Sequence, residues 1–465
     1  MNAKTSTIGS APIKDARVLG KPKMLILGLQ HMFAMFGATV LVPILVQSYG
    51  LPLNTQTTLF FAGFGTLFFH FCTKLKVPAF LGSSFAFLGG FSAMAELSSG
   101  MYATMEPSEK LQYACGGIVI AGLLYVILAA IIKAVGVHRV MHFLPPVVTG
   151  PIIILIGLNL APSAVSNASS CWWLALVSMA IIIVANIWGR GMIKIIPILL
   201  GVVGGYVVAL CAGMVDFSGF AGSSLLTGEN AVLGLQPFLK NFSGSVAKFD
   251  LTAILVMAPI AIASMMEHIG DVSAISATVG ENFIEDPGLH RTLIGDGVAT
   301  ALAGLFGGPA NTTYGENTGV LALTRVYDPL VIRLAAVYAI IASFCPKFAA
   351  LVSAMPTGTI GGVSLILYGM ISAIGVRNLV ENRVDLAKSR NVIVVSLIIS
   401  LALGITFSAA GAITFHVGEF TLNFSGLAVA AIVGIVVNAI LPGKDYDFQN
   451  DYEYGKTTED HGQML

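Results

Sequence analysis

Three acidic residues lie within apolar segments of this sequence, where a charged group is costly unless it has a partner or a function. Glu267 and Asp271 are four residues apart, so a helix would place both carboxylates on one face. Two neighbouring carboxylates repel each other when both are ionised, which suits a carrier of protons. The third acid, Glu316, begins another apolar stretch. An acid at membrane depth indicates a functional site.

The residues around Glu316 predict a broken membrane segment. A helix-breaking Gly-Gly-Pro at 307–309 precedes a β-prone Thr-Thr-Tyr at 312–314, and an apolar run at 320–323 follows the acid. We therefore predict an extended piece followed by a short helix, whose unpaired backbone groups point into a site near the membrane midplane. The alternative is a loop in which Glu316 is only a first-turn helix acid.

Four other polar residues are candidates for the same site. His31 lies early in the first apolar segment, where a proton-carrying role and simple packing are both open. Asn311 and Asn317 flank Glu316, and we expect them to brace the broken segments rather than to bind a ligand. Tyr368, in a later apolar segment, either faces the site or packs.

The composition is that of a polytopic membrane protein. The 465 residues are 56% hydrophobic and 10% charged, and the mean hydropathy is +0.85. A formal net charge of zero gives no support for nucleic-acid binding. The five cysteines are scattered without a CxxC pair, so neither a disulfide framework nor a zinc site is indicated. The first 23 residues are polar and basic and predict a cytoplasmic tail rather than a signal peptide.

The apolar segments give about 14 candidate membrane spans, each compared with the roughly 20 residues that a bilayer requires. They are near 24–47, 54–73, 79–97, 111–133, 144–162, 172–189, 196–214, 251–270, 292–307, 311–327, 330–350, 356–375, 391–410 and 424–441. With both ends of the chain inside, only about four basic residues, Lys110, Lys240, Lys248 and Lys347, fall outside. This distribution follows the positive-inside rule.

The two halves resemble each other. Leu81–Phe85 parallels Asn311–Gly315, since both combine hydroxyl residues, an aromatic and a glycine near a break. Gly150, Leu155, Gly157 and Ala161 recur at constant offset as Gly362, Leu367, Gly369 and Ala373. Seven spans per half would make the second copy enter the membrane from the opposite side. We therefore predict inverted repeats whose paired broken segments form the binding site.

The run Glu316–Arg325 resembles the signature of the nucleobase-ascorbate transporters, the nucleobase:cation symporter-2 family. In that signature an acid, glutamine or proline is followed by Asn-x-Gly, four residues, Thr, and a basic residue or glycine. The runs 30–43, 82–87 and 267–270 resemble other motifs of the family. A glutamate at position 316 is similar to the bacterial uracil permeases. Asp271 departs from the uracil permeases, which often have a histidine at this position. Purine-type members of the family often have an acid there.

The resemblance implies an all-α polytopic fold of 14 transmembrane segments in two inverted seven-span repeats. Spans 3 and 10 would be broken and contribute short antiparallel β-strands. Spans 1–4 (24–134) and 8–11 (251–350) would form a core domain, and spans 5–7 (144–214) and 12–14 (356–442) a gate domain. The remaining pieces would be an extracytoplasmic loop at 215–250 and cytoplasmic tails at 1–23 and 443–465. Homodimers and proton-coupled uptake in a bacterial inner membrane are also implied.

The resemblance also assigns site residues. The substrate would contact the carboxylates of Glu267 and Glu316, the backbone of Phe85 and Gly315, and the neighbouring Tyr314, Ala34 and Tyr368. Proton coupling would involve Glu267, Asp271 or His31. Asn311, Asn317 and Ser84 would support the site.

We therefore expect a uracil:proton symporter without a cofactor other than the proton, and not an enzyme. A purine or xanthine permease of the same family is the nearest alternative. An intramembrane metal enzyme using His31, His268, Glu267 and Asp271 is disfavoured, because adjacent Glu267 and His268 point about 100° apart on a helix and no HExxH spacing occurs. A channel or anion carrier is disfavoured, because two buried acids facing the site would disfavour anions.

Overall fold

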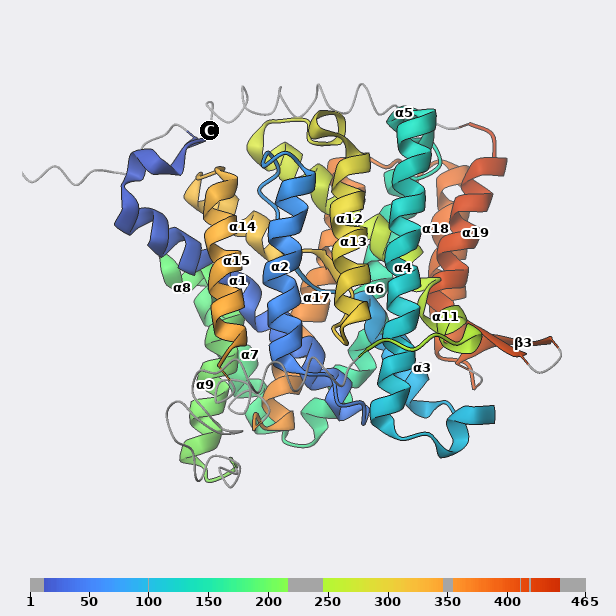
Figure 1. Ribbon diagram of the computed structural model, residues 1–465, viewed down its shortest axis with the longest axis horizontal. Coiled ribbons are helices and arrows are strands. Elements are labelled where there is room, and N and C mark those ends of the chain that lie inside the picture. Colours follow the sequence, from blue (N-terminus) through green and yellow to red (C-terminus); the bar gives the residue numbers. More distant parts are fainter. Residues whose placement is uncertain are drawn as a thin grey trace, which may run out of the picture.

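The computed structural model describes residues 12–98, 100–215, 246–345, 354–409, 411–417 and 420–443. Most of the predicted loop at 215–250, residues 1–11 and 444–465 of the predicted tails, and the end of the predicted span 330–350 lie outside these ranges. The described chain is mostly helical, and its long helices run roughly parallel to one another (Figure 1).

The helices of the first half are α1 (Lys21–Ser48), α2 (Thr55–Cys72), α3 (Leu88–Glu96), α4 (Pro107–Val135), α5 (Val137–Met141), α6 (Pro146–Ser169), α7 (Trp172–Ile187), α8 (Met192–Ile195) and α9 (Pro197–Cys211). Those of the second half are α11 (Leu251–Met257), α12 (Ile260–Val279), α13 (Leu289–Leu305), α14 (Gly315–Thr324), α15 (Pro329–Ser343), α17 (Thr357–Glu381), α18 (Ser389–Thr406) and α19 (Gly426–Ile440). Short helical turns are η1 (Ala16–Leu19), η2 (Phe85–Phe87), η3 (Gly100–Thr104) and η5 (Ile284–Gly288). The strands are β1 (Leu81–Ser83), β2 (Asn311–Thr313), β3 (Ala412–Val417) and β4 (Phe420–Ser425).

Local sequence signals explain where many helices begin. Proline is the first residue of α4, α6, α9 and α15, a position that needs no backbone N–H donor. Side-chain oxygens of Asn54, Asp250 and Asp328 accept hydrogen bonds from the first turns of α2, α11 and α15.

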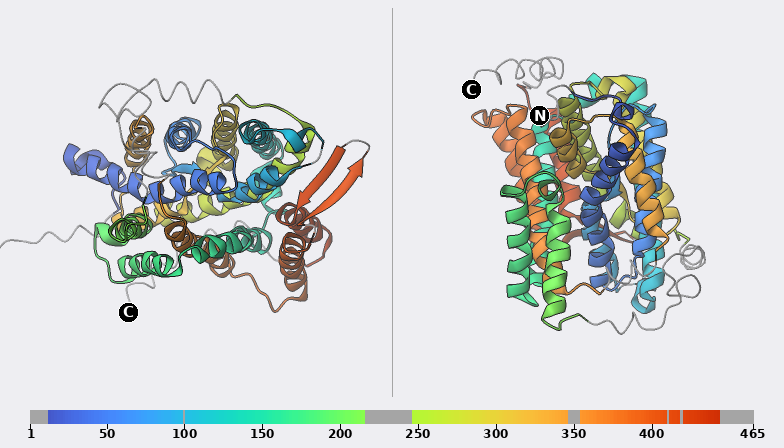
Figure 2. Two further views of the ribbon diagram at one scale, coloured as in Figure 1. Left: turned by 90° about the horizontal axis from the view of Figure 1, so that it is seen from below. Right: turned by 90° about the vertical axis from the view of Figure 1, so that its left-hand side faces the viewer.

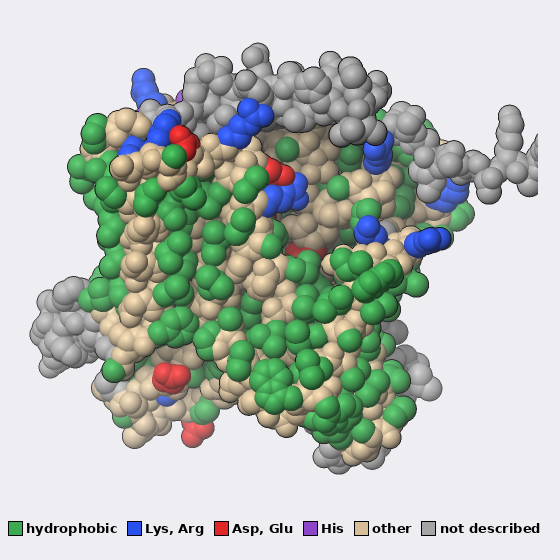
Figure 3. Space-filling view, turned by 180° about the vertical axis from the view of Figure 1, so that it is seen from behind, with side chains coloured by type: hydrophobic (Ala, Val, Ile, Leu, Met, Phe, Trp, Pro, Cys, Tyr) green, Lys and Arg blue, Asp and Glu red, His purple; other side chains and the backbone are tan. Residues whose placement is uncertain are grey.

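Several elements have the length and composition to cross a membrane. In the described ranges, six helical stretches qualify, and five shorter apolar helices accompany them. Lys and Arg side chains gather toward one end of the molecule, as the positive-inside rule predicts for a cytoplasmic end (Figure 3). The chain is thus a multi-pass membrane protein.

Two broken segments meet in the middle of the helical assembly. β1 and β2 pair antiparallel, with Leu81 opposite Thr313 and Ser83 opposite Asn311. Two further backbone bonds extend the pairing, from Ser84 N to Ala310 O at 2.8 Å and from Tyr314 N to Phe80 O at 3.0 Å. The short antiparallel strands predicted for spans 3 and 10 are confirmed.

The helices divide by their contacts into two groups (Figure 2). α1, α2, α4, α13 and α15 pack on one another, while α6, α7, α9, α17, α18 and α19 form a second set. Within the second set, α6 and α17 approach closely at Gly150 and Gly375, and Ser372 Oγ donates to Ile154 O at 2.9 Å. Small residues permit such close backbone approach between membrane helices.

One boundary and one hairpin differ from the sequence prediction. The eighth span was predicted to end at 270, which is wrong because α12 continues to Val279. The apolar face continues with Val272 and Ile275 beyond the acids, and Gly280 in the left-handed conformation (φ 73°) ends the helix. The hairpin β3–β4, which joins α18 to α19, was not predicted.

Replacing Gly375 with alanine tests the α6–α17 contact. A Cβ at this position would lie 2.5 Å from Ile154 N and 2.6 Å from Gly150 O, so the two helices must separate. We expect a loss of about 1–3 kcal/mol, seen as a lower melting temperature of the detergent-purified protein.

Gly369→Ala, in the same helix, is the matched control because no atom lies within 4 Å of its added Cβ. Its melting temperature should be unchanged or slightly raised. Equal melting temperatures for the two variants would contradict the proposed close contact.

Candidate functional site

The acids of α12 lie on a helix face that meets β2 and α14. Glu267 is half-buried, and Asp271 is only 6% exposed. Thr313 of β2 donates its hydroxyl to Asp271 Oδ2 at 2.7 Å. Because α12 continues for two turns beyond it, Asp271 does not sit at the end of the span, and it belongs to the same site as Glu267.

The N-terminus of α14 faces these acids. Gly315 and Glu316 begin the helix, where backbone N–H groups have no partner within the helix and carry partial positive charge. A Cβ placed on Gly315 would lie 3.8 Å from Asp271 Oδ1 and 3.3 Å from Ile374 Cδ1 of α17. The half-buried Glu316 therefore adds a third carboxylate to a site that α12, α14 and α17 border.

Tyr314 joins the two broken segments. Its hydroxyl donates to Ser83 O at 2.8 Å, and its ring lies so close to Gly82 that a Cβ there would clash with it. Ser83 Oγ in turn donates to Thr39 O of α1 at 2.9 Å. With only 4% of its surface exposed, Tyr314 acts as a structural bridge in this conformation.

Phe85 and Tyr368 close one side of the site. They come from η2 and α17, and their rings meet edge to face with centroids 5.9 Å apart and planes at 74°. Ser84, next to Phe85, lies with its Oγ 3.3 Å from Ser264 Oγ of α12. The structure thus places η2 between α12 and α17.

Two asparagines, Asn311 and Asn317, join the broken segment to neighbouring helices. Asn317 Nδ2 donates to His31 O at 3.1 Å and lies 3.3 Å from His31 Nδ1, which joins α14 to α1. Asn311 Nδ2 donates to Phe61 O of α2 at 3.4 Å. Ala34 is buried one turn beyond His31, on the helix that packs against β1 and α14.

His268 points away from the carboxylates of Glu267 and Asp271. Its Nδ1 lies 2.8 Å from Asp296 Oδ2 of α13, and both side chains are fully buried. Nothing in the sequence spacing identifies Asp296 and His268 as partners. Within the described ranges, no three His, Cys, Asp or Glu side chains converge to hold a metal ion.

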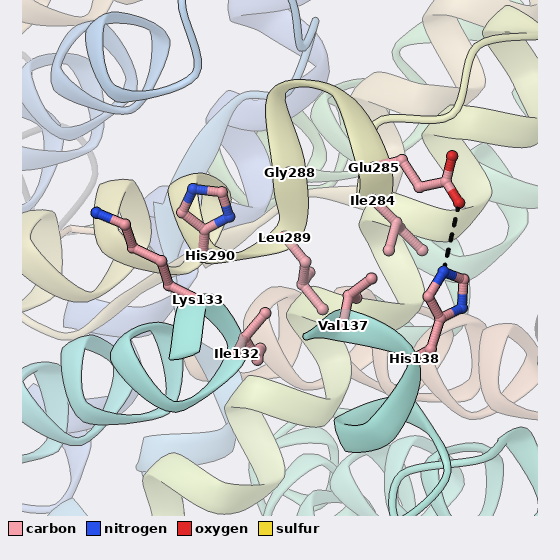
Figure 4. Close-up of a pocket in the computed structure, with 9 residues that line it drawn as sticks. All are labelled: Ile132, Lys133, Val137, His138, Ile284, Glu285, Gly288, Leu289 and His290. Carbon is pink, nitrogen blue, oxygen red and sulfur yellow. Dashed lines mark ion pairs between the residues drawn. The ribbon is translucent and has the colours of Figure 1, made fainter. Parts of the chain in front are cut away.

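A surface pocket of about 260 Å³ lies elsewhere, between the C-terminal end of α4 and the N-terminal end of α13 (Figure 4). His138 Nε2 lies 3.7 Å from Glu285 Oε1 at its edge. Partial burial, then the nearby positive charges of Arg291, Lys133 and Lys74, lower the pKa of His290. No predicted site residue lines this pocket.

On another face, the surface is hollowed near the basic end, and acidic side-chain atoms are visible at the bottom of this hollow (Figure 3).

Comparisons with known proteins show the family of this chain. The permease family model matches residues 22–411. The uracil permease of Bacillus caldolyticus is 41% identical over 95% of this chain and 96% of its own, and that of Bacillus subtilis (strain 168) is 40% identical over 93% and 94%.

Solved structures share the fold at low identity. The murine solute carrier 26 family member A9 anion transporter matches with a TM-score of 0.61 at 11% identity, over 94% of this chain and 73% of that one. This similarity concerns the fold alone. The match over most of the sequence confirms the family resemblance, and the chain belongs to the permease family of multi-pass membrane transporters.

Proposed function

We propose that this protein imports uracil together with a proton across the bacterial cytoplasmic membrane. The observation that carries the proposal is the contact between α12, which bears the half-buried Glu267, and α14, whose first turn bears the half-buried Glu316. Two relatives at 40–41% identity over nearly the whole chain are uracil permeases. This similarity supports the same substrate here.

The chemistry of uracil matches the groups at this site. One edge of the base alternates N–H donors with C=O acceptors. The carboxylates of Glu267 and Glu316 would accept from the N–H groups, while the backbone amides of Phe85 and Gly315 would donate to the carbonyls. Tyr368 and Ala34 would border the ring, and Tyr314 would hold the two strands beneath it.

Proton coupling would use Asp271. The three carboxylates from α12 and α14 would share one site, where a proton on one of them would relieve their mutual repulsion. Asp271 is the most enclosed of the three and is held by the Thr313 hydroxyl. Glu267 and the buried His31 are the other candidates for the proton.

Transport would proceed by alternating access. The two packing groups of helices support a division into a core (spans 1–4 and 8–11) and a gate (spans 5–7 and 12–14), which would form two inverted seven-span repeats. The antiparallel pairing of β1 with β2 supports the inverted relation of spans 3 and 10. A loaded, protonated core would slide against the gate, and the gate helices would form the contact of a homodimer.

Thermal stabilisation by nucleobases tests the substrate and the role of Glu316. A ligand that binds only the folded protein raises its melting temperature, by an amount equivalent to about 2.7 kcal/mol at 100 times Kd. We expect uracil to raise the melting temperature of the purified protein, and xanthine, hypoxanthine, adenine and ascorbate to leave it unchanged. Glu316→Gln should weaken the effect and Glu316→Ala abolish it, because the N–H groups of the base lose their acceptor.

Two outcomes would change the assignment. Stabilisation by xanthine rather than uracil would keep the family and replace the substrate with a purine, for which an acid at position 271 is the clue. Near-normal uracil binding by Glu316→Ala would remove Glu316 from the recognition groups.

Asp271→Asn tests the proton path separately. The amide keeps the size of the side chain and can still accept from Thr313, but it cannot take up a proton. In proteoliposomes, uptake driven by a pH gradient should fall by about tenfold or more, while the Kd for uracil changes by less than about threefold. Uptake that still responds to the pH gradient as in the wild type would exclude Asp271 from the path.

A further inference from the structure

The segment Pro12–Gly20, which we term the N-terminal strap, is bound to the chain that follows α14. Ile13 N donates to Arg325 O at 2.9 Å, and Tyr327 N donates to Ile13 O at 2.8 Å. These bonds form a parallel β-bridge between Ile13 and Val326. The strap therefore attaches where the half-helix bearing Glu316 ends.

Ala16 anchors the strap more deeply. It is fully buried, and its N–H donates to Asp328 Oδ2 at 2.8 Å. The same carboxylate accepts from Leu330 N at 2.8 Å, so it also caps α15. Ala16 forms a small apolar cluster with Val326 and Val331, edged by Ile13, Leu19, Met24 and Leu27.

The strap also reaches α12. Lys14 Nζ lies 2.5 Å from Glu281 Oε1, and Glu281 is the second residue beyond the last residue of α12. One short segment thus contacts the far ends of both elements that carry the carboxylates of the site. Glu267 and Asp271 lie on one of these elements and Glu316 on the other.

We propose that the N-terminal strap is a positioning element of the uracil site, which sets the separation between the carboxylates of α12 and the N-terminus of α14. The inference rests on the proposed function and extends it to residues far from the base. α14 has ten residues and is about 15 Å long, so it moves as a rigid rod. A shift at Arg325 is therefore transmitted to Gly315 and Glu316.

A purely structural role is the competing explanation. In that case the strap would add stability by covering apolar surface, and its loss would lower the melting temperature without changing the affinity of the folded protein for uracil. A positioning role requires that affinity and local order at the start of α14 change as well. The two explanations are separated by measuring all three quantities.

The first test compares Ala16→Leu with Val18→Leu. Ala16 has no space for a larger side chain, whereas Val18, two residues along the same strap, is 74% exposed. Ala16→Leu should displace the strap, weaken uracil binding in calorimetry by about fivefold or more, and speed hydrogen exchange in peptides covering 311–324. Val18→Leu should match the wild type in both measurements.

The second test reverses the ion pair between Lys14 and Glu281. Both side chains are partly exposed, so Lys14→Glu or Glu281→Lys alone should weaken uracil binding by only about two- to fivefold. The double variant Lys14→Glu/Glu281→Lys restores opposite charges and should return toward the wild-type affinity. Such rescue is not expected if each change acts independently.

The outcomes separate the two proposals. A wild-type protein that binds no uracil contradicts the proposed function, and the strap is then judged by hydrogen exchange at 311–324, which needs no substrate. Faster exchange there in Ala16→Leu but not in Val18→Leu supports the strap as a positioning element. Unchanged exchange and unchanged affinity in Ala16→Leu, with only a lower melting temperature, would overturn it.

Discussion

The pairing of β1 with β2 is the contact on which the candidate site depends. Within a bilayer, a backbone N–H or C=O without a partner costs several kcal/mol, so a chain that leaves its helix must find hydrogen bonds elsewhere. Each of the two broken segments supplies those bonds to the other, through three paired positions and the flanking bonds of Ser84 and Tyr314. A break in one segment can therefore be accommodated only if the other segment is broken as well, because each segment supplies the hydrogen bonds that the other has lost.

This pairing also places a helix N-terminus at depth in the protein. Because β2 passes directly into α14, the partial positive charge of the first turn lies next to carboxylates from α12. That charge lowers the cost of keeping acids near one another, and Thr313 adds a hydrogen bond to the most enclosed of them. The proposed ligand, which has both donors and acceptors, would meet both kinds of group there, and Glu267 Oε2 has no hydrogen-bond partner among the described residues.

The sequence predicted the parts of this arrangement that depend on local residue types. A Gly-Gly-Pro break, a β-prone triplet and an acid before an apolar run were sufficient to predict the strand and half-helix at 311–324. The length of α12 was missed, because Asp271 resembles a residue at a span boundary when only hydropathy is considered.

Contacts between distant segments carry no such local signal. The pairing of His268 with Asp296 depends on how α12 rotates against α13. The docking of Ile13 beside Val326 joins residues more than 300 positions apart. Helix packing determines both contacts, and the hydrophobic pattern of either partner alone does not encode them.

The contacts differ in kind within and between the two proposed domains. Inside the core, directional hydrogen bonds join the elements of the site, as between Asn317 and His31 or between Tyr314 and Ser83. Between core and gate, most of the close contacts at the site are aliphatic or aromatic. A Cβ on Gly37 of α1 would meet Ile198 of α9, and the Phe85 ring meets that of Tyr368. A Cβ on Gly270 of α12 would meet Ile153 of α6 and also the side-chain amide of Asn378 of α17.

This difference has a mechanical consequence. A hydrogen bond is lost when its atoms separate by about an ångström, whereas a methyl group sliding over a glycine exchanges one weak contact for another. A core held by directional bonds can therefore move as one body along a gate that it touches mainly through apolar groups. The geometry of the carboxylates around the base would then be preserved during the proposed movement, because every group proposed to bind the base, apart from Tyr368, belongs to the proposed core.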